Sequence, residues 1–419
     1  ENKYFLNSRA STLAVSTTHS RASNATMVDS DGLLKWAPHN LLTYSEEKPP
    51  SGWAFSDGTN TTVVELANGL GGVQFVGTGA SNCRMREILT FPSPGNYTLA
   101  AYVDPASTYT GIALKAGGLT GASGDTNASA SEADGNGLIS CTFTVDAADL
   151  IAAVDLGALT VTSNTLILGG WHIFRSDLGG MVNNPATGDS YVPTTDAAVY
   201  LPRTGHHIYN GTAWVNEGLL LESEARTNLV TYSTNLADDW QKSSGITITE
   251  ESSGFYAVTS DGDNNDRAKN PTDVAVVNGD ILTGAMDIDA RNSSDGAFFD
   301  MTIGTAGSHR VFTRLTVSGD VLTIANPTAT NNTLAVTGVV GIKDLGDGKW
   351  RVSFSAKNIS MGNIDWALQL WRRDGTDVSI HIRYPQFELG TTPSSYIPTS
   401  GAAATRAAET LVVPAANMP

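Results

Sequence analysis

The segment at residues 40–45 reads Asn-Leu-Leu-Thr-Tyr-Ser, and it returns at residues 228–233 as Asn-Leu-Val-Thr-Tyr-Ser. Trp53 follows the first copy and Trp240 follows the second, at nearly the same distance. A tryptophan that recurs at a matched position more often packs in a core than forms a ligand platform. The two segments therefore indicate one structural unit that occurs twice, each time with a packed tryptophan.

Further matched segments follow both copies in the same order. They are residues 95–99 with 279–283, residues 135–137 with 346–348, and residues 191–194 with 396–399. Arg203 and Arg406 come a few residues after the last pair. The matched segments lie roughly 190–210 residues apart, and two copies of that length are too few and too long for a solenoid. We therefore predict two homologous domains.

Each copy has the pattern of short strands. Residues 99–103 and 350–354 alternate with a period of two, and Asp-Gly turn signals recur along the chain. The one modest helix candidate is residues 147–154, with Asp146 as its cap. Short strands at this spacing over about 150 residues favour an antiparallel sandwich, so we predict an all-β fold.

The predicted organisation has five parts. The connector belongs to the repeat, because Glu217-Gly218-Leu219-Leu220 precedes the second copy just as Asp31-Gly32-Leu33-Leu34 precedes the first. The parts are an N-terminal arm (1–35), a first β-sandwich (36–176), a strand-containing connector (177–227), a second β-sandwich (228–390) and a C-terminal tail (391–419).

Charge excludes some partners. The 419 residues carry a formal net charge of −17, with a sequence pI of about 4.7. Such an acidic surface repels phosphate backbones and anionic lipid, so we expect neither nucleic-acid nor membrane binding. Two cysteines, Cys83 and Cys141, are too few for a disulfide framework. Two buried free thiols are favoured over one bridge between them.

The best local candidate for a binding face lies between Asp365 and Tyr384. If residues 366–371 and 378–383 pair as a hairpin around Asp374-Gly375-Thr376, their apolar positions share one face. The other face then carries Trp371, Gln369, His381 and Arg383. An aromatic plane with planar polar groups suits a sugar ring and its hydroxyls. The competing interpretation is an ordinary outer face with Trp371 packed against the connector.

The turn at residues 261–266 is rich in oxygen ligands that suit Ca²⁺, with Asp261, Asp263 and Asp266 as candidate ligands. It does not fit EF-hand spacing, because its sixth position is Asp266 rather than glycine. A plain solvated turn is the favoured alternative. We expect no other cofactor.

The case for an enzyme is thin. The sequence contains no G-x-S-x-G, no H-E-x-x-H and no phosphate-binding glycine loop. A glycosidase needs only two carboxylates, and Glu222 and Glu224 would share a strand face. Glu224, however, has Arg226 and Arg203 as simple pairing partners. We predict no catalytic residues and no enzymatic activity.

Several of these segments resemble tailed-bacteriophage virion appendage proteins, meaning head fibres, head spikes and tail fibres. The resemblance rests on residues 218–233, 346–352 and 387–408, and more weakly on residues 20–32. The first domain departs from the pattern, because Trp36-Ala37-Pro38-His39 replaces the Glu-Ala-Arg lead-in found at residues 224–226. The resemblance supplies no catalytic residues.

The resemblance implies carbohydrate-binding-module-like, concanavalin-A-like jelly rolls on the surface of a virion. It also implies a homo-oligomer, with a trimer as the expected state, held by other virion proteins. We expect a non-enzymatic appendage that contacts host surface glycan. A purely structural capsid or tail component and a glycan-cleaving enzyme remain the alternatives.

Overall fold

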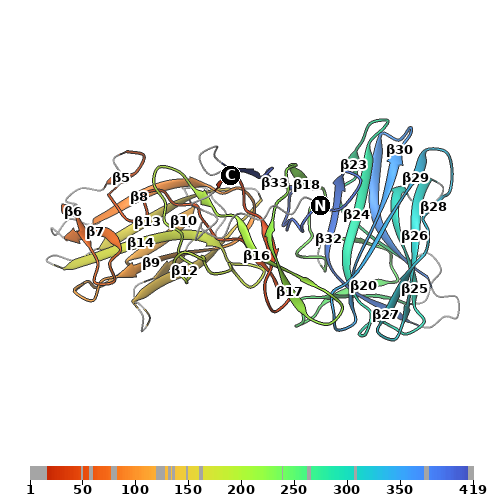
Figure 1. Cartoon of the computed structure of the whole chain (residues 1–419), viewed down its shortest axis with the longest axis horizontal. Coiled ribbons are helices and arrows are strands. Elements are labelled where there is room, and N and C mark those ends of the chain that lie inside the picture. Colours follow the sequence, from red (N-terminus) through yellow and green to blue (C-terminus); the bar gives the residue numbers. More distant parts are fainter. Residues whose placement is uncertain are drawn as a thin grey trace.

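The computed structural model describes residues 17–48, 51–55, 60–76, 83–118, 128–130, 134, 137–147, 150–159, 164–237, 239–261, 266–305, 309–371 and 377–413. These residues form strands and loops without a helix. No helix in this part of the chain is therefore long and apolar enough to cross a membrane. The all-β prediction is confirmed: two jelly-roll β-sandwiches lie at opposite ends of the molecule, with connector strands between them (Figure 1).

The first sandwich has two five-stranded antiparallel sheets. One has the order β12(Leu138–Val145), β9(Gly95–Val103), β14(Thr165–Arg175), β7(Gly71–Val76), β6(Asn60–Glu65). The other has the order β11(Ala128–Ala130), β10(Leu114–Gly118), β13(Ile151–Leu159), β8(Cys83–Thr90), β5(Ala54–Phe55). The helix predicted at 147–154 is wrong, because its apolar run becomes β13, which pairs on both sides in the core.

The second sandwich is larger. One sheet has the order β20(Ile246–Glu250), β21(Tyr256–Ser260), β32(Val378–Leu389), β24(Ile281–Asp289), β30(Lys349–Asn358), β29(Leu334–Asp344). The other has the order β19(Gln241–Lys242), β22(Asp266–Lys269), β31(Asn363–Trp371), β25(Phe298–Thr305), β26(His309–Ser318), β27(Val321–Ile324). Two short strands, β23(Val274–Ala275) and β28(Thr328–Ala329), pair with β31 and β26.

The two sandwiches share one strand order. The path β12-β9-β14-β7-β6 in the first corresponds to β30-β24-β32-β21-β20 in the second. The path β10-β13-β8-β5 corresponds to β25-β31-β22-β19. The matched tryptophans are both core residues: Trp53 packs on Trp171, and Trp240 packs on Trp366. The internal repeat in the sequence therefore reflects a repeated topology.

The repeated asparagines explain why the sequence motif recurs. Asn40 and Asn228 are fully buried, and each uses both ends of its amide. Asn40 donates to the carbonyls of Trp171 and Val192 and accepts from the amides of Leu42 and Ile173. Asn228 donates to the carbonyls of Pro385 and Ile397 and accepts from the amides of Val230 and Phe387. Each asparagine therefore satisfies backbone groups of three chain segments at once.

The repeated serines close the same junction. Ser45 Oγ lies 2.8 Å from Tyr191 Oη and accepts from the amide of Thr194. Ser233 Oγ accepts from Tyr396 Oη at 2.7 Å and from the amide of Thr399. The motif pair Asn-Leu-x-Thr-Tyr-Ser and Tyr-x-Pro-Thr is thus a structural clamp in both sandwiches.

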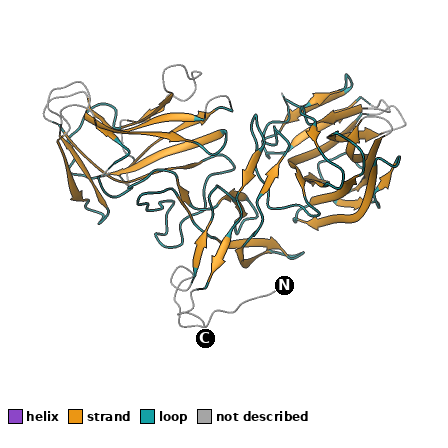
Figure 2. Cartoon of the chain, turned by 90° about the horizontal axis from the view of Figure 1, so that it is seen from above, coloured by secondary structure: helices purple, strands orange, loops and turns teal. Residues whose placement is uncertain are grey.

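Short paired strands fill the space between the sandwiches (Figure 2). The longest pair is a hairpin of β16(Arg203–Tyr209) and β17(Trp214–Leu220). The remaining pairs are β1(Thr18–Ser20) with β34(Thr410–Val412), β2(Thr26–Val28) with β3(Leu34–Trp36), β4(His39–Asn40) with β15(Val199–Tyr200), and β18(Arg226–Asn228) with β33(Ala404–Arg406).

Buried charges tie this middle layer together. Glu409 accepts hydrogen bonds from Arg21 of the arm and, at 2.5 Å, from Arg203 of the connector. Glu222 pairs with Arg203 at 2.7 Å and with Arg406 at 3.1 Å. Arg21, Arg203, Arg406 and Glu409 are all buried. Arm, connector and tail therefore share one ionic network.

Candidate functional site

The predicted hairpin between residues 366–371 and 378–383 is wrong. Strand β31 pairs with β22 and β25 in one sheet, whereas β32 pairs with β21 and β24 in the other. Both apolar faces were assigned correctly, because Trp366, Leu368 and Leu370 are buried in the same core as Val378, Ile380 and Ile382. Two half-apolar strands can bury those faces by packing across a sandwich as well as by pairing side by side.

The four residues of the predicted sugar-binding face are consequently not brought together by strand pairing. The side chains of Trp371 and Gln369 lie outside the described part of the structure. His381 is buried, and its Nδ1 lies 2.9 Å from Glu251 Oε2. Of the two members whose side chains are described, Arg383 lines a cavity and His381 does not.

The candidate calcium turn is described only at its ends. Asp263 lies outside the described residues, and Asp261 is exposed. Asp266 is buried, and its carboxylate accepts hydrogen bonds from Ser243 Oγ at 2.9 Å and Ser260 Oγ at 2.5 Å. The described residues contain no group of three or more acidic, histidine or cysteine side chains that could hold a metal. Hydroxyl donors thus already occupy the carboxylate of Asp266.

Cys141 is a free, buried thiol, and burial raises its pKa to about 11. It is therefore an unreactive packing residue. The side chain of Cys83 lies outside the described part.

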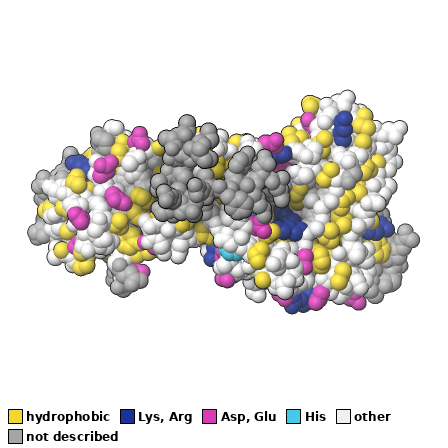
Figure 3. All heavy atoms as spheres, viewed as in Figure 1, with side chains coloured by type: hydrophobic (Ala, Val, Ile, Leu, Met, Phe, Trp, Pro, Cys, Tyr) yellow, Lys and Arg dark blue, Asp and Glu magenta, His cyan; other side chains and the backbone are white. Residues whose placement is uncertain are grey.

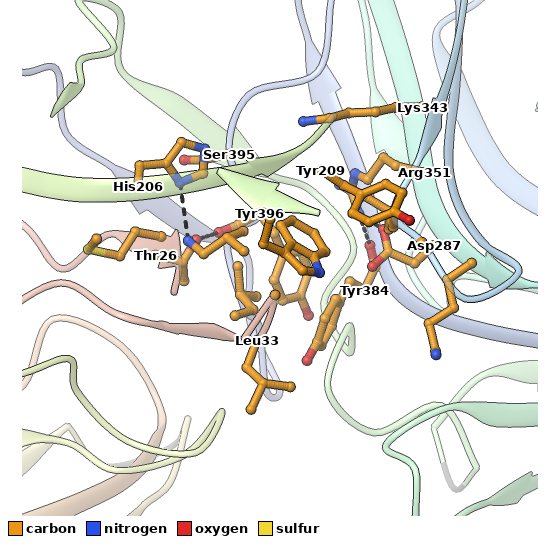
Figure 4. A pocket seen from close by; sticks show the side chains of 18 of the residues that line it. Thr26, Leu33, His206, Tyr209, Asp287, Lys343, Arg351, Tyr384, Ser395 and Tyr396 are labelled. Carbon is orange, nitrogen blue, oxygen red and sulfur yellow. Dashed lines mark hydrogen bonds and ion pairs between the residues drawn. The ribbon is translucent and has the colours of Figure 1, made fainter. Parts of the chain in front are cut away.

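A cavity of about 790 Å³ lies where the arm, the connector hairpin and the second sandwich meet (Figure 4). Lys343, Arg351 and Asp287 come from the sandwich, and Thr26, Leu33 and His206 face them from the arm and hairpin. The volume is in the range of small-ligand sites. A space-filling view shows basic side chains gathered where the middle layer meets this sandwich (Figure 3).

The floor of the cavity is a row of charged residues across four adjacent strands. Lys343 of β29 is directly opposite Arg351 of β30, which is opposite Asp287 of β24, which is opposite Arg383 of β32. Directly opposite residues project from the same face of a sheet. Asp287 accepts hydrogen bonds from Arg351 Nη1 at 2.9 Å and Arg383 Nε at 3.3 Å. We call these four residues the charged row.

The row ends at a bulge that both sandwiches contain. Pairing shifts register between Gly169 and His172 in the first sandwich and, on β32, between Arg383 and Gln386 in the second. Gly170 has a φ of 58° and Tyr384 a φ of 53°, so the left-handed position is equivalent in the two. Glycine adopts this conformation freely, but for tyrosine it costs on the order of 1–2 kcal/mol. Strain of this kind is concentrated at functional sites.

Aromatic side chains of the connector hairpin form the opposite wall. The Tyr209 and Trp214 rings lie 5.6 Å apart, centroid to centroid, and both are partly exposed. A Cβ built on Gly32 would lie 2.2 Å from the Trp214 ring, so the arm approaches the indole as only glycine permits. Tyr209 packs in the same way on Gly346, in the turn between β29 and β30. The hairpin therefore bridges the arm and the second sandwich.

Two of the carboxylates that line the cavity, Glu222 and Asp347, have lowered pKa values. Burial by itself would raise the pKa of Glu222, but Arg203 and Arg406 outweigh it and lower that pKa. Hydrogen bonds from Lys349 and Arg291 lower the pKa of Asp347 to about 2. Burial lowers the pKa of His206 to about 4, so this imidazole is neutral at pH 7 and accepts a hydrogen bond from the amide of Val28. None of these groups is suited to be a general acid at neutral pH.

No family model matches this sequence, and no curated protein matches it. Among solved structures it is similar to the N-terminal CBM22-1-CBM22-2 tandem domain of Paenibacillus barcinonensis Xyn10C, at 10% identity, with a TM-score of 0.30, over 85% of this chain and 98% of that one. It is also similar to infectious bursal virus derived T=1 particles, at 12% identity, with a TM-score of 0.21, over 95% of this chain and 74% of that one. Likenesses with TM-scores this low carry no argument about function.

The sequence identified Arg383 as a candidate but not the other three residues of the charged row. Lys343, Arg351 and Asp287 are up to 64 residues apart in the sequence and meet only through strand register. The structure supplies the comparison: Asn40 accepts from the amide of Ile173 and Asn228 from that of Phe387, so Gly170 and Tyr384, each three residues earlier, are equivalent. A glycine replaced by a bulky residue in the second copy marks a difference between the two sandwiches.

Proposed function

We propose that this chain is a non-enzymatic glycan-binding appendage of a virion, and that the cavity beside the second sandwich is its binding site. The observation that carries the proposal is the pairing of half-exposed aromatic rings with a polar floor. Tyr209, Trp214 and Tyr384 offer ring faces, and the charged row offers hydrogen-bond donors and an acceptor. Saccharides need both, because their C–H faces stack on aromatic rings while their hydroxyls pair with planar polar groups.

The virion context rests on the resemblance to tailed-bacteriophage appendage proteins. The segments that carry it, residues 218–233 and 387–408, contain β18, β33 and the clamp residue Asn228. These segments build the junction between the connector and the second sandwich. The resemblance thus supports a shared way of assembling the appendage, while the ligand is set by side chains of this chain. A homo-oligomer, with a trimer as the expected state, would multiply weak sites through avidity.

The charge state of the cavity favours binding over catalysis. A glycosidase requires one carboxyl with a raised pKa as the acid and a second as base or nucleophile. Glu222 and Asp347 instead have lowered pKa values, and Asp287 is held between two arginines. A glycan would therefore be held and not cleaved.

The experiment is sedimentation of the full-length chain with bacterial cells, before and after their surface polysaccharide is stripped. We expect attachment that stripping abolishes and that Trp214→Ala reduces at least tenfold. Phe55→Ala is the matched control, because it removes an exposed ring from the first sandwich. Attachment that survives stripping would contradict a glycan receptor. Release of reducing ends from the polysaccharide would contradict the non-enzymatic assignment.

A further inference from the structure

The charged row has more positive than negative side chains. Three of its four members are cations, and Asp287 is the single anion. Lys343 and Arg351 are directly opposite each other on adjacent strands, an arrangement of like charges that destabilises a sheet. Asp287 and Glu217 act on the Lys343 ammonium, but burial and the neighbouring Arg351 outweigh them and lower its pKa. An anion bound beside this pair of cations would relieve their repulsion.

Two of the other carboxylates that line the cavity are already paired with cations, and the third, Asp31, is exposed. Glu222 is neutralised by Arg203 and Arg406, which belong to the buried ionic network. Asp347 is neutralised by Lys349 and Arg291. The row itself therefore keeps three cations against one anion, in a chain whose formal net charge is −17.

Hydrogen-bond donors on the row also lack acceptors. Arg351 uses Nη1 for Asp287 and for the carbonyl of Tyr384, but its buried Nη2 has no partner. Within the described residues Arg383 donates only through Nε, and its guanidinium lies 4.3 Å from the Phe255 ring centroid and 4.7 Å from that of Tyr384. Buried donors are normally satisfied by protein, water or ligand, so Nη2 is open to an acceptor from outside the chain. A planar guanidinium with free donors matches a carboxylate best.

The equivalent place in the first sandwich has none of these features. The residues in register there are Leu138, Tyr102 and Gly169, which carry no charge. A Cβ on Gly170 would lie 2.8 Å from Leu70, so the space above the bulge is filled. The row is therefore not a requirement of the shared fold but a property of the second sandwich alone.

We propose that the cavity selects acidic saccharides, and that a sugar carboxylate lies over Lys343, Arg351 and Arg383 while the ring stacks on the hairpin aromatics. This inference rests on the proposed function and names the substrate class of the same site. It assigns one site to each chain, in the second sandwich. Because the contact is ionic, binding weakens as salt is added.

The test is isothermal titration of the full chain with short uronate oligosaccharides: tetragalacturonate, tetramannuronate and a hyaluronan tetrasaccharide. Each is compared with its carboxyl-reduced counterpart, which keeps the same sugar backbone without the charge. We expect binding of at least one acidic member at one site per chain and at least tenfold weaker binding of its reduced form. Lys343→Gln should cost about tenfold in affinity and flatten the salt dependence.

Lys357→Gln is the control, because it removes the same charge from an exposed position of β30. Equal affinity for acidic and reduced forms, or no effect of Lys343→Gln, would overturn the acidic-sugar assignment and leave a glycan-binding protein. If a sulfated dextran oligosaccharide bound equally well, the site would recognise any anionic sugar and not specifically a carboxylate. That result would also overturn the acidic-sugar assignment. Failure to bind either the acidic or the neutral forms, with cell attachment also lost, would overturn the proposed function itself.

Discussion

At the residue scale, Tyr384 combines a costly backbone conformation with a ring in the cavity. Its equivalent in the first sandwich is Gly170, which takes the same φ without strain. Substituting Tyr384 by alanine or by glycine removes the ring in both cases, so the two variants differ only in their tolerance of a positive φ. We expect the glycine variant to be more stable by about 1 kcal/mol.

Chemical denaturation of the two Tyr384 variants measures this difference, and glycan titration of both provides a second readout. Both should lose binding to the same extent, since both lack the ring. If the alanine variant were as stable as the glycine variant, the left-handed conformation assigned to position 384 would be incorrect.

Glu87 of β8 is a second residue for which we make a prediction, because its surroundings shift its pKa. Burial raises its pKa to about 7, against a weak opposing hydrogen bond from Thr43, and its Oε2 has no partner. The folded state therefore holds a proton that the unfolded chain releases near its ordinary pKa of 4.5. Stability from this group is complete below about pH 4.5 and is lost as the pH rises through 7.

Glu87→Gln keeps a neutral side chain at every pH, so we expect it to remove that loss. The variant should be more stable than the parent at pH 8, by roughly 2 kcal/mol, and about equal to it at pH 4. Denaturant unfolding of the first sandwich at the two pH values is the measurement. A variant that destabilises the protein equally at both would show that Glu87 does not bind a proton on folding.

At the scale of elements, the β16–β17 hairpin is held in place by a contact that tolerates no side chain. Gly32 has a φ of 75°, and a Cβ there would lie 2.2 Å from the Trp214 ring. Gly32→Ala must therefore displace the indole as well as strain the turn. We expect a loss of about 1–2 kcal/mol and weaker glycan binding, because the aromatic wall of the cavity moves.

Gly211→Ala is the control for the Gly32 prediction. Gly211 lies at the tip of the same hairpin, has a φ of 96°, and a Cβ there would meet nothing within 4 Å. The Gly211→Ala variant should lose stability, because alanine disfavours a positive φ, but it should keep its glycan affinity. Similar binding losses in both variants would indicate that the hairpin, and not the placement of Trp214, governs affinity.

The elements also show what the sequence could and could not predict. Alternation correctly assigned the apolar faces of β31 and β32, and the repeat correctly indicated two equivalent sandwiches. Alternation does not say whether two strands pair or pack face to face, so the predicted hairpin was wrong, and strand pairing does not bring its four surface residues together. The charged row depends on register across β29, β30, β24 and β32, which no local pattern specifies. Arg383 was found because alternation places it on the same face of its strand as His381.

At the scale of the whole molecule, the middle layer decides how the two sandwiches are held. Its ionic network joins the arm through Arg21, the connector through Arg203 and the tail through Glu409. These residues are far apart in sequence and are brought together only when all three segments are in place. Burying them costs desolvation energy, so the network contributes more to a defined arrangement than to net stability.

Glu409→Gln tests this role directly. Burial alone would raise the pKa of Glu409, but His19, Arg203 and the amide of Glu222 outweigh it and lower that pKa. The carboxylate therefore stabilises the fold above its ordinary pKa, and this contribution is lost as the pH falls. Removing it leaves two buried guanidinium groups short of a partner, for which we expect a loss of about 3–5 kcal/mol at pH 7. Hydrogen exchange should accelerate first in β1 and β34, which flank the network, while the sandwich cores stay protected.

Glu224→Gln is the control: it breaks an ion pair in which Glu224 is 72% exposed, and it should cost less than 1 kcal/mol. If both variants cost the same, the sandwiches are held by their backbone pairings and not by the shared charges.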